Sequence, residues 1–443
     1  MKEPINSTKS FYITTLGCPK NTTDSMQMEF SMIDEGLVPA HSAEESDFHI
    51  INTCSFIKSA TEETIDTILN AAKVKKQKNQ RLIVAGCFSQ RYPEEIKKDI
   101  PEVDLIFGTG KYNDAGKIIK EKFKNEFSSI IANSDFLLTR NKYAANLHNL
   151  GKPFSYIKIS DGCNRGCHFC IIPTLRGEFK SSSRESILEN VKLAVSNGAK
   201  EICVISQDTV FYARDIEELK SLLNEMTEVP GVELVRILYL YPDKKTEKLL
   251  DIFLENKKIA PYLESPIQHI SERILKLMNR TGSPEFIKEL FAKARRREGL
   301  EIRTSIIMGY PTETANDVDM VLDFIEEVKP EKLALFPFSP EEGTKAFKLK
   351  GKINNREIAN RINLARDTHL NVLKQIHASR IGKVYDAISE ESGDDGIIAR
   401  RFQDAPEIDE IVFLSTGKPK SGTIGKVRID SFLEYDMEGT WIN

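Results

Sequence analysis

The stretch Ser160-Asp161-Gly162-Cys163-Asn164-Arg165-Gly166-Cys167-His168-Phe169-Cys170 organises the rest of this chain. Its three cysteines have the spacing C-x3-C-x2-C in a Gly-containing loop, directly after a strand-like run over 154–159. Thiolates at such short spacing can all face one small inorganic centre, and iron–sulfur clusters are held by Cys thiolates. Three ligands leave one iron of a 4Fe-4S cube without a protein donor, and a reactive metal centre needs such an open position. The loop therefore predicts a 4Fe-4S cluster with one accessible iron.

The spacing of Cys163, Cys167 and Cys170 resembles the signature of radical S-adenosylmethionine enzymes. That resemblance implies that the amino and carboxylate groups of S-adenosylmethionine chelate the open iron, and that reductive cleavage yields a 5'-deoxyadenosyl radical. Two other interpretations stay open, a set of redox-active thiols and a zinc site that includes His168. A zinc site would need an unusual loop, because His168 immediately follows Cys167 in the chain.

The composition is that of an ordinary globular protein, with 443 residues, 40% of them hydrophobic and 29% charged. This length allows two to four domains. The first ten residues are polar, so we expect no secretory signal, and no apolar run reaches the length of a membrane span. The net charge of -4 gives no basic footprint for DNA or other nucleic acid across the whole chain. Seven cysteines, an odd number, argue against a disulfide framework and favour a reducing, cytoplasmic location.

Residues 10–122 alternate strand-like and helix-like runs, which is typical of a parallel α/β sheet. The expected strands are Phe11–Leu16, Phe48–Asn52, Leu82–Ala85 and Val103–Phe107, with helices from Asp24 and over Ser59–Lys73. Cys18, Cys54 and Cys87 each follow one of these strands, so all three should emerge at the carboxyl edge of one sheet, where ligands collect. Taken singly, a cysteine is more often a buried hydrophobe, as we expect for Cys203. Three in the same topological position predict a second 4Fe-4S cluster, again with an open iron.

Residues 150–375 predict a partial (βα)6 barrel that follows a polar connection over 125–151. The six expected strands are Phe154–Ile159, Glu201–Ser206, Leu234–Leu240, Ser265–Gln268, Ile302–Met308 and Leu333–Phe338. Polar or Gly-containing turns follow these strands. In a barrel such turns lie on the same face as the cysteine loop, so this face is the expected place of the reaction.

Five residues in this region are candidates for binding the cofactor. Arg176 and Arg184 could each pair with its carboxylate, because a guanidinium grips a carboxylate bidentately, or could lie at a solvated helix start. Phe169, between two ligands, could pack against the cluster or the adenine. Gln268 could hydrogen-bond the ribose or the substrate. The turn that starts at Gly309 could approach the adenine by its backbone or simply end a strand.

Residues 380–443 predict a small antiparallel β-barrel, which a helix over Asn355–Ser379 connects to the preceding segment. The expected strands are Lys383–Ile388, Gly396–Arg401, Ile411–Leu414 and Gly425–Asp430. From Arg380 onward there are eight basic and thirteen acidic residues, a net charge of about -5. Binding of nucleic acid by counterion release needs Lys and Arg, so this acidic barrel is better suited to dock a basic protein or to keep the surface soluble.

With all three segments in place, the chain resembles the methylthiotransferase family of radical S-adenosylmethionine enzymes over nearly its whole length. The resemblance rests on the sequence around each strand-end cysteine, on the loop from Cys163 to Arg176, on Pro266–Ser271 and on Ser339–Thr344. Asp404–Asp409 resembles the terminal TRAM barrel of that family. Glu341-Glu342-Gly343-Thr344 stands where the RNA-acting relatives usually have Arg-Pro-Gly-Thr, which favours the branch that modifies small-subunit ribosomal protein twelve.

The resemblance implies that a C–H on the β-carbon of an aspartate in that ribosomal protein is replaced by C–SCH3. Cys163, Cys167 and Cys170 would hold the cluster that cleaves S-adenosylmethionine, and an electron donor of unidentified nature would reduce it. Cys18, Cys54 and Cys87 would hold an auxiliary cluster that delivers sulfur, and a second S-adenosylmethionine would donate the methyl group. The nearest alternative is a tRNA adenosine methylthiotransferase with the same clusters; a more distant one is a non-enzymatic zinc-binding or RNA-binding module.

Overall fold

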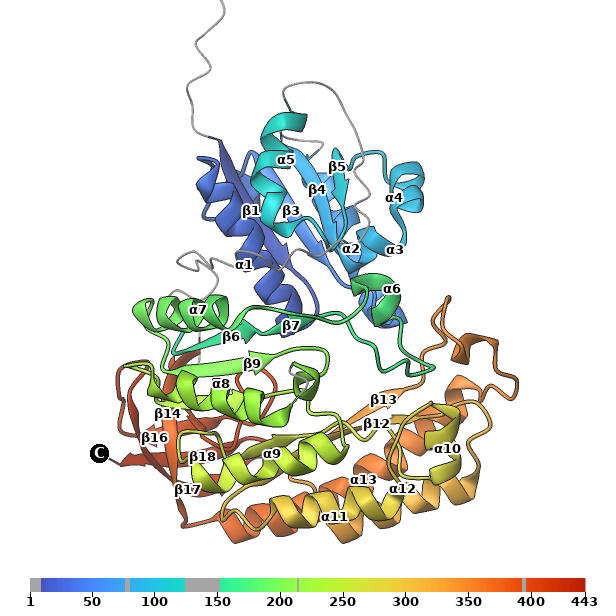
Figure 1. The fold of residues 1–443 in the computed structure, drawn as a ribbon, viewed down its shortest axis with the longest axis vertical. Coiled ribbons are helices and arrows are strands. Elements are labelled where there is room, and N and C mark those ends of the chain that lie inside the picture. Colours follow the sequence, from blue (N-terminus) through green and yellow to red (C-terminus); the bar gives the residue numbers. More distant parts are fainter. Residues whose placement is uncertain (1–8, 76–79, 124–151, 213–214, 393–395, 443) are drawn as a thin grey trace, which may run out of the picture. The chain divides into compact units, whose positions relative to one another are not determined.

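The computed structural model describes residues 9–75, 80–123, 152–212, 215–392 and 396–442 (Figure 1). The chain separates into two compact units. The first unit contains the described part of residues 1–148 together with 161–164 and 170–193, and the second contains the rest. The predicted polar connection over 125–151 lies outside the described residues. Among the described residues, no helix combines the length and apolar character that crossing a membrane requires.

The first unit is built on a parallel sheet with the strand order β2-β1-β3-β4-β5. Its strands are β1 (Ser10–Thr15), β2 (Val38–Pro39), β3 (Phe48–Thr53), β4 (Arg81–Gly86) and β5 (Leu105–Phe107). Its helices are α1 (Pro19–Asp34), α2 (Lys58–Lys75), α3 (Cys87–Arg91), α4 (Pro93–Asp99) and α5 (Ala115–Lys122). The predicted strands are confirmed. Helix α1 begins a turn before the predicted Asp24, because Pro19 occupies its first position, where proline is favoured.

Both faces of this sheet are covered by helices (Figure 1). Met28 and Met32 of α1 and Ile119 of α5 pack on one face, and Ile68 of α2 and Ile96 of α4 pack on the other. A parallel sheet covered on both sides carries strands that are apolar throughout, and every residue of β3 is buried. The two cores leave the carboxyl ends of the strands, where the three cysteines follow, as the functional edge of this unit.

The cysteine loop lies between β7 (Ser160–Asp161) and α6 (Ile172–Arg176). Strand β8 (Lys180–Ser181) and helix α7 (Arg184–Ser196) come next in the chain. Residues 161–164 and 170–193 belong to the first unit although they follow β6 (Phe154–Lys158) of the second. The segment after the loop is therefore part of the unit that carries Cys18, Cys54 and Cys87.

The second unit contains six parallel strands in two hydrogen-bonded sets, β10-β9-β6 and β11-β12-β13. These strands are β6, β9 (Glu201–Ile205), β10 (Leu234–Ile237), β11 (Tyr262–Glu264), β12 (Glu301–Met308) and β13 (Lys332–Pro337). The two sets are continuous, because Ala260 N donates to Val235 O (2.9 Å) and Val235 N to Lys258 O (2.8 Å). This arrangement confirms the predicted partial barrel.

One strand prediction in this barrel is wrong. The strand expected over 265–268 lies instead at β11, three residues earlier. Pro266 has no N–H for a ladder, and Gln268 has a positive φ of 71°, so the chain leaves regular strand geometry there. Gln268 keeps a single bridge to Ile306 of β12, with Gln268 N donating to Ser305 O (2.8 Å).

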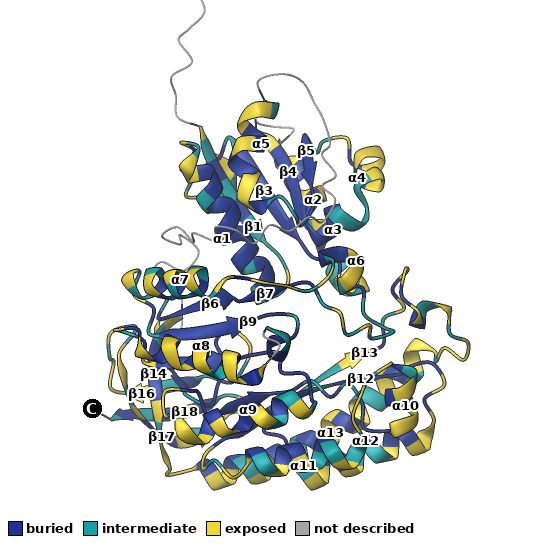
Figure 2. Ribbon diagram, in the orientation of Figure 1, coloured by how far each residue is buried: buried dark blue, intermediate teal, exposed yellow. Residues whose placement is uncertain are grey.

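Helices cover the outside of the second unit: α8 (Ile216–Glu228), α9 (Lys244–Glu255), α10 (Glu272–Leu277), α11 (Pro284–Ala294), α12 (Ala315–Val328) and α13 (Asn355–Arg380). Figure 2 shows that α9 and α11 bury one stripe and expose the other, as surface helices do. Helix α12 begins with a capping box, in which the side chains of Thr314 and Asp317 accept from each other's backbone N–H.

The end of the chain forms a closed barrel with the strand order β14-β15-β16-β18-β17. Its strands are β14 (Val384–Ser392), β15 (Gly396–Arg401), β16 (Val412–Thr416), β17 (Ile424–Phe432) and β18 (Met437–Ile442). The four predicted strands are confirmed, and β18 is an additional one. The barrel is not purely antiparallel as predicted, because β18 closes it by pairing in parallel with β16.

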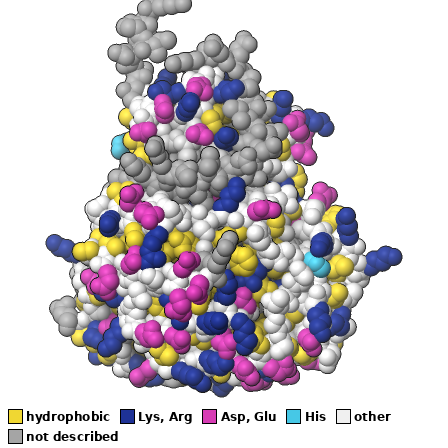
Figure 3. All heavy atoms as spheres, in the orientation of Figure 1, with side chains coloured by type: hydrophobic (Ala, Val, Ile, Leu, Met, Phe, Trp, Pro, Cys, Tyr) yellow, Lys and Arg dark blue, Asp and Glu magenta, His cyan; other side chains and the backbone are white. Residues whose placement is uncertain are grey.

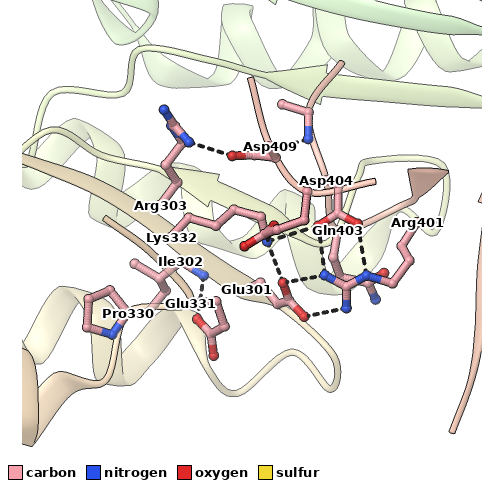
Figure 4. A network of polar contacts seen from close by, with 12 residues as sticks. Glu301, Ile302, Arg303, Pro330, Glu331, Lys332, Arg401, Gln403, Asp404 and Asp409 are labelled. Atoms are coloured by element: carbon pink, nitrogen blue, oxygen red, sulfur yellow. Dashed lines mark hydrogen bonds and ion pairs between the residues drawn. The ribbon is translucent and has the colours of Figure 1, made fainter. Parts of the chain in front are cut away.

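A buried polar network joins this barrel to strands β12 and β13 (Figure 4). Glu301 accepts from both Nη atoms of Arg401 (2.9 and 3.1 Å) and from Lys332 Nζ (2.5 Å). Asp404 also pairs with Arg401 and Lys332, and Arg303 pairs with Asp409. These ion pairs cross from the terminal barrel to β12 and β13, and leaving one of the buried charges without its partner would cost about 3–5 kcal/mol.

Candidate functional site

The three strand-end cysteines of the first unit lie in loops that hydrogen bonds tie together. Asn21, in the first turn of α1, donates to Leu16 O (2.7 Å) and Thr53 O (3.0 Å). Asn52, at the end of β3, donates in return to Asn21 O (2.8 Å). Thr53 Oγ1 donates to Ala85 O (2.5 Å), which joins the second loop to the third. The fold therefore brings together Cys18, Cys54 and Cys87, which we call the auxiliary site.

Two glycines allow these loops to approach one another closely. A Cβ on Gly17 would lie 2.8 Å from Cys54 Cβ and 3.0 Å from Cys54 Sγ. A Cβ on Gly86 would lie 2.5 Å from Asn52 Oδ1 and 2.7 Å from Thr53 O. Both glycines also have positive φ, of 93° and 100°, which other residues adopt only with strain. The three cysteines thus lie on closely packed neighbouring loops, and their thiols have the right donor chemistry for an iron–sulfur cluster.

Burial raises the pKa of two of these thiols, Cys54 and Cys87. Burial raises the pKa of Cys87 to about 12, and the guanidinium of Arg176 opposes that rise. Burial also raises the pKa of Cys54, which a backbone hydrogen bond from Phe56 partly opposes. Without metal, the thiols of Cys54 and Cys87 are therefore protonated at neutral pH, and binding a cluster would require both to release their protons. A bound cluster would supply the compensating positive charge that the buried thiolates need.

Arg176 lies beside this auxiliary site, which corrects the expectation that it is open to a cofactor carboxylate. Its side chain is 2% exposed. Its Nη2 donates to Asn21 Oδ1 (2.8 Å) and Asp24 Oδ2 (2.7 Å), and its Nη1 donates to Asp161 Oδ2 (3.1 Å). Two carboxylates of the first unit already satisfy this guanidinium.

The second set of cysteines, Cys163, Cys167 and Cys170, lies in residues 162–170, which we call the radical-SAM loop. All three side chains are partly exposed. Gly162 and Gly166 have positive φ, of 72° and 67°, and bend the backbone between the ligands. A Cβ on Gly162 would lie 2.1 Å from Glu178 O, so only glycine fits there. Three accessible thiols in one short loop fit a cluster that must bind a cofactor at its surface.

In the second unit, Arg280 contacts Cys167 and stacks, together with Arg165, on Tyr241. Arg280 Nη1 lies 3.8 Å from Cys167 Sγ, within hydrogen-bond range for sulfur. The Arg280 and Arg165 guanidinium carbons lie 4.2 and 3.9 Å from the Tyr241 ring centre. Arg165 also pairs with Asp208 and Asp243. The Arg280 contact places positive charge beside the Cys167 sulfur, which would tune the potential of a cluster bound there.

His168 is held by the second unit in a way that does not favour a zinc site. Its Nδ1 hydrogen-bonds to Leu277 O (2.9 Å), its N donates to Met278 O (3.0 Å), and its O accepts from Ala346 N (2.8 Å). In the described part of the chain, no three His, Cys, Asp or Glu side chains are arranged to hold a single metal ion. A cluster of four irons is larger than one ion and spreads its thiolates further apart, so this finding concerns a mononuclear site only.

The remaining candidate residues lie at several places. Phe169 packs against the apolar cluster that contains Tyr310 and Phe338 in the second unit. Gln268 Nε2 donates to Ser305 Oγ (3.3 Å) beside the barrel strands. Gly309 N donates to both carboxylate oxygens of Glu313 (3.0 and 2.9 Å), so its N–H already has a partner within its own turn. Arg184 is partly buried at the first position of α7.

Sequence reasoning did not single out four polar residues of these sites. Asn21 and Asp24 face Arg176 from α1, Asp161 faces it from the start of the radical-SAM loop, and Arg280 contacts Cys167. Asn21 lies three residues after Cys18 and Asp161 two residues before Cys163, so their proximity to the cysteines was a usable signal. Nothing in the sequence pairs Arg280 with Cys167, which lies more than a hundred residues earlier.

Three family models match the chain in succession. Residues 10–108 match the uncharacterized protein family UPF0004, residues 157–325 match the radical SAM superfamily, and residues 381–442 match the TRAM domain. The solved structure of the radical S-adenosylmethionine methyltransferase TsrM from Kitasatospora setae covers 74% of this chain and 73% of its own, with a TM-score of 0.54 and 12% identity. That likeness concerns the fold alone. The fold and the cysteine loop thus define a radical S-adenosylmethionine protein with a terminal TRAM barrel.

Relatives of known name are similar over the whole length. The ribosomal protein uS12 methylthiotransferase RimO of Leptospira biflexa is 56% identical over 443 residues, which are 100% of this chain and 99% of the relative. The protein of the same name from Thermodesulfovibrio yellowstonii is 39% identical, covering 97% of this chain and 99% of the relative. The chain belongs to the RimO methylthiotransferase family.

Proposed function

We propose that this protein replaces a C–H on the β-carbon of an aspartate in ribosomal protein uS12 by C–SCH3, in the cytoplasm. An unactivated C–H has no acidic proton, so neither a general base nor a polar nucleophile can attack it. When bound, two 4Fe-4S clusters and S-adenosylmethionine supply the radical, the sulfur and the methyl group, while the protein binds and orients them. An electron donor outside this chain provides the reducing electron.

The observation that carries this proposal is the assembly of the auxiliary site. Cys18, Cys54 and Cys87 are far apart in sequence, yet they follow strands that end at one sheet edge, and hydrogen bonds join their loops. We propose that these three hold the auxiliary cluster and that Cys163, Cys167 and Cys170 hold the cluster that cleaves S-adenosylmethionine. The proposed domains are residues 10–122, 150–375 and 380–443. We propose that four further residues contact S-adenosylmethionine: Phe169, Arg184, Gln268 and Gly309.

The charges of the terminal barrel support a protein substrate over tRNA. Arg380, Arg400 and Arg401 are buried in ion pairs with carboxylates of the second unit. Lys426 and Arg428 pair with neighbouring carboxylates on the barrel surface. Binding of RNA by counterion release needs cations that can face phosphates, and the three buried arginines cannot do so. The other five cations of this segment are exposed, against thirteen acidic residues. On the face shown in Figure 3, dark blue and magenta side chains alternate over the second unit, with no broad basic stripe.

The test is anaerobic turnover of the reconstituted full chain with S-adenosylmethionine, a reductant and either uS12 or tRNA. We expect the protein to bind about eight irons, two cubes by the ligand count. We expect uS12 to gain the mass of one SCH2 group on an aspartate, and tRNA to gain nothing, as read by mass spectrometry. A gain on tRNA alone, or no gain on uS12 with both clusters loaded, would contradict the proposal.

A further inference from the structure

The guanidinium of Arg176 connects two parts of the first unit that carry cysteines. Through Nη1 it pairs with Asp161, the residue directly before the radical-SAM loop. Through Nη2 it pairs with Asp24 and Asn21 of α1, the helix that Cys18 caps. The same Nη2 lies 3.8 Å from Cys87 Sγ. One buried cation thus contacts the base of one cysteine loop and a thiol of the other site.

Asp161 directly precedes the radical-SAM loop and Arg176 is the last residue of α6, which follows the loop, so their ion pair joins the two segments that flank it. Asp161 Oδ1 accepts from Gly162 N (2.9 Å), and Cys163 N donates to Gly177 O (3.2 Å). The backbone at the start of the loop, at Cys163, is therefore held beside Gly177, the residue after Arg176. Arg176 is therefore linked to the backbone beside Cys163 through Asp161 and Gly162.

Packing holds the other end of the connection. Ile171 and Leu175 of the segment that ends at Arg176 form an apolar cluster with Cys87. Thr109 Oγ1, beyond the end of β5, donates to Leu175 O (2.8 Å). Cys170 directly precedes Ile171 in the chain. The last ligand of the radical-SAM loop is thus one residue away from the side chain that packs on Cys87.

The charges explain why this arginine acts inside the protein. Burial would lower the pKa of the Arg176 guanidinium, but Asp24 and Asp161 raise it well above its ordinary value, so it stays charged. The buried group already contains one cation and two carboxylates. Adding the carboxylate of S-adenosylmethionine would bring a third negative charge to one cation, which burial makes costly.

We propose that Arg176 is a positioning residue for both clusters, holding the Cys163 end of the radical-SAM loop and Cys87 of the auxiliary site in a fixed relation. This inference rests on the proposed function, because it needs two clusters. Substituting a residue that hydrogen-bonds to metal ligands and orients them typically lowers metal affinity or activity by about ten- to a hundredfold. An arginine with only a structural role would change stability and leave the spectra of the clusters alone.

The test uses three substitutions in the full chain: Arg176→Lys, Asp24→Asn and Asp161→Asn. Lysine keeps the charge but cannot reach both carboxylates with one planar fork. Each substitution is made in two backgrounds, one without Cys18, Cys54 and Cys87, the other without Cys163, Cys167 and Cys170, so that each cluster is seen alone. The measurements are iron content, the electron paramagnetic resonance spectrum of the reduced cluster and its midpoint potential.

We expect Asp24→Asn to change the auxiliary cluster alone, Asp161→Asn to change the radical-SAM cluster alone, and Arg176→Lys to change both. In the otherwise native chain, Arg176→Lys should also raise the ratio of 5'-deoxyadenosine formed to uS12 modified by about tenfold. The matched control is Arg236→Lys, a fully buried arginine of the second unit paired with Glu201. It should lower stability and leave both spectra unchanged.

Unchanged spectra and potentials of both clusters in Arg176→Lys would overturn the inference. If that variant fails to fold, Asp24→Asn and Asp161→Asn decide instead, and equal effects of each on both clusters, or on neither, would overturn it. A parent protein that holds one cluster or none contradicts the proposed function itself, so the two failures are distinguishable.

Discussion

The auxiliary site and the radical-SAM loop each offer three thiols to a cluster, but the two sites are built in different ways. Cys18, Cys54 and Cys87 come from three separate strand ends, and Cys54 and Cys87 are 8% and 4% exposed while Cys18 is partly exposed. The loop carries its three cysteines within eight residues and leaves each partly exposed. A site assembled from distant segments exists only once its sheet has folded. A site within one loop brings its cysteines together by local backbone bends, and contacts from distant residues then hold the loop.

This difference fits two different tasks. In the auxiliary site two of the three thiols are buried and their loops are tied together by hydrogen bonds, which would hold the proposed auxiliary cluster in place. Exposed thiols in a glycine-bent loop suit a cluster that must meet a small-molecule cofactor, as open catalytic metal sites do. The order in which substitutions and conditions damage the two sites should therefore differ.

The largest effects should come from removing single ligands. Cys163→Ala should abolish cleavage of S-adenosylmethionine, because the cluster that binds it loses one of only three thiolates. Cys87→Ala should leave that cleavage in place and abolish sulfur insertion. Chromatography of 5'-deoxyadenosine and mass spectrometry of uS12 measure the two steps separately. The division of tasks between the sites is wrong if Cys87→Ala still yields methylthiolated uS12.

Cys203→Ala is the matched control for both ligand substitutions. Cys203 is fully buried within β9 of the second unit, as the sequence predicted for a core residue. Its loss should cost about 1 kcal/mol of stability, as typical core changes do, and leave the iron content unchanged. A loss of iron in this variant would show that iron content reports general damage.

Much of this contrast could be predicted from the sequence, for physical reasons. Periodicity and strand-end position sufficed to place Cys18, Cys54 and Cys87 on one edge, because parallel strands end together. Arg176 could not be placed, because a guanidinium at a helix end looks the same in sequence whether it meets a cofactor or Asp24. The strand expected at 265–268 was misplaced because the prediction did not take into account that Pro266 has no N–H to donate to a neighbouring strand.

The next largest effect should come from adding a side chain where two loops of the auxiliary site are in close contact. Gly86→Ala places a Cβ 2.5 Å from Asn52 Oδ1 at a backbone φ of 100°. Overpacking and the positive φ together should cost about 2–4 kcal/mol and halve the iron bound, because only the auxiliary site is distorted. Denaturant unfolding and iron analysis measure these two results.

Gly36→Ala separates the two causes. Gly36 has a similar φ of 81°, but a Cβ there would meet nothing within 4 Å. It should cost only the backbone term of about 1–2 kcal/mol and keep the full iron content. If Gly86→Ala also keeps full iron, the close approach of the loops does not matter for the cluster.

A smaller effect should follow acidification, and it should fall on the first unit. Burial lowers the pKa of His49, in the strand that precedes Cys54, to about 4. The unfolded chain then binds the proton more readily, so stability is complete above pH 6.5 and falls as the pH drops toward 4. The loss between pH 7.5 and 5.5 should be about 1.4 kcal/mol in denaturant unfolding. His49→Gln should remove this loss, while His41→Gln, an exposed control, should keep it.

The smallest expected effect concerns the potential of the radical-SAM cluster. Arg280 Nη1 lies 3.8 Å from Cys167 Sγ, and its charge and hydrogen bond both favour the more negative, reduced cluster. Arg280→Gln should therefore lower the midpoint potential by about 40 mV, the equivalent of one hydrogen bond of about 1 kcal/mol for one electron. Arg296→Gln removes an equal charge from an exposed position of the same unit and should leave the potential unchanged. Equal shifts in both variants would mean that overall charge, and not contact with the sulfur, sets this potential.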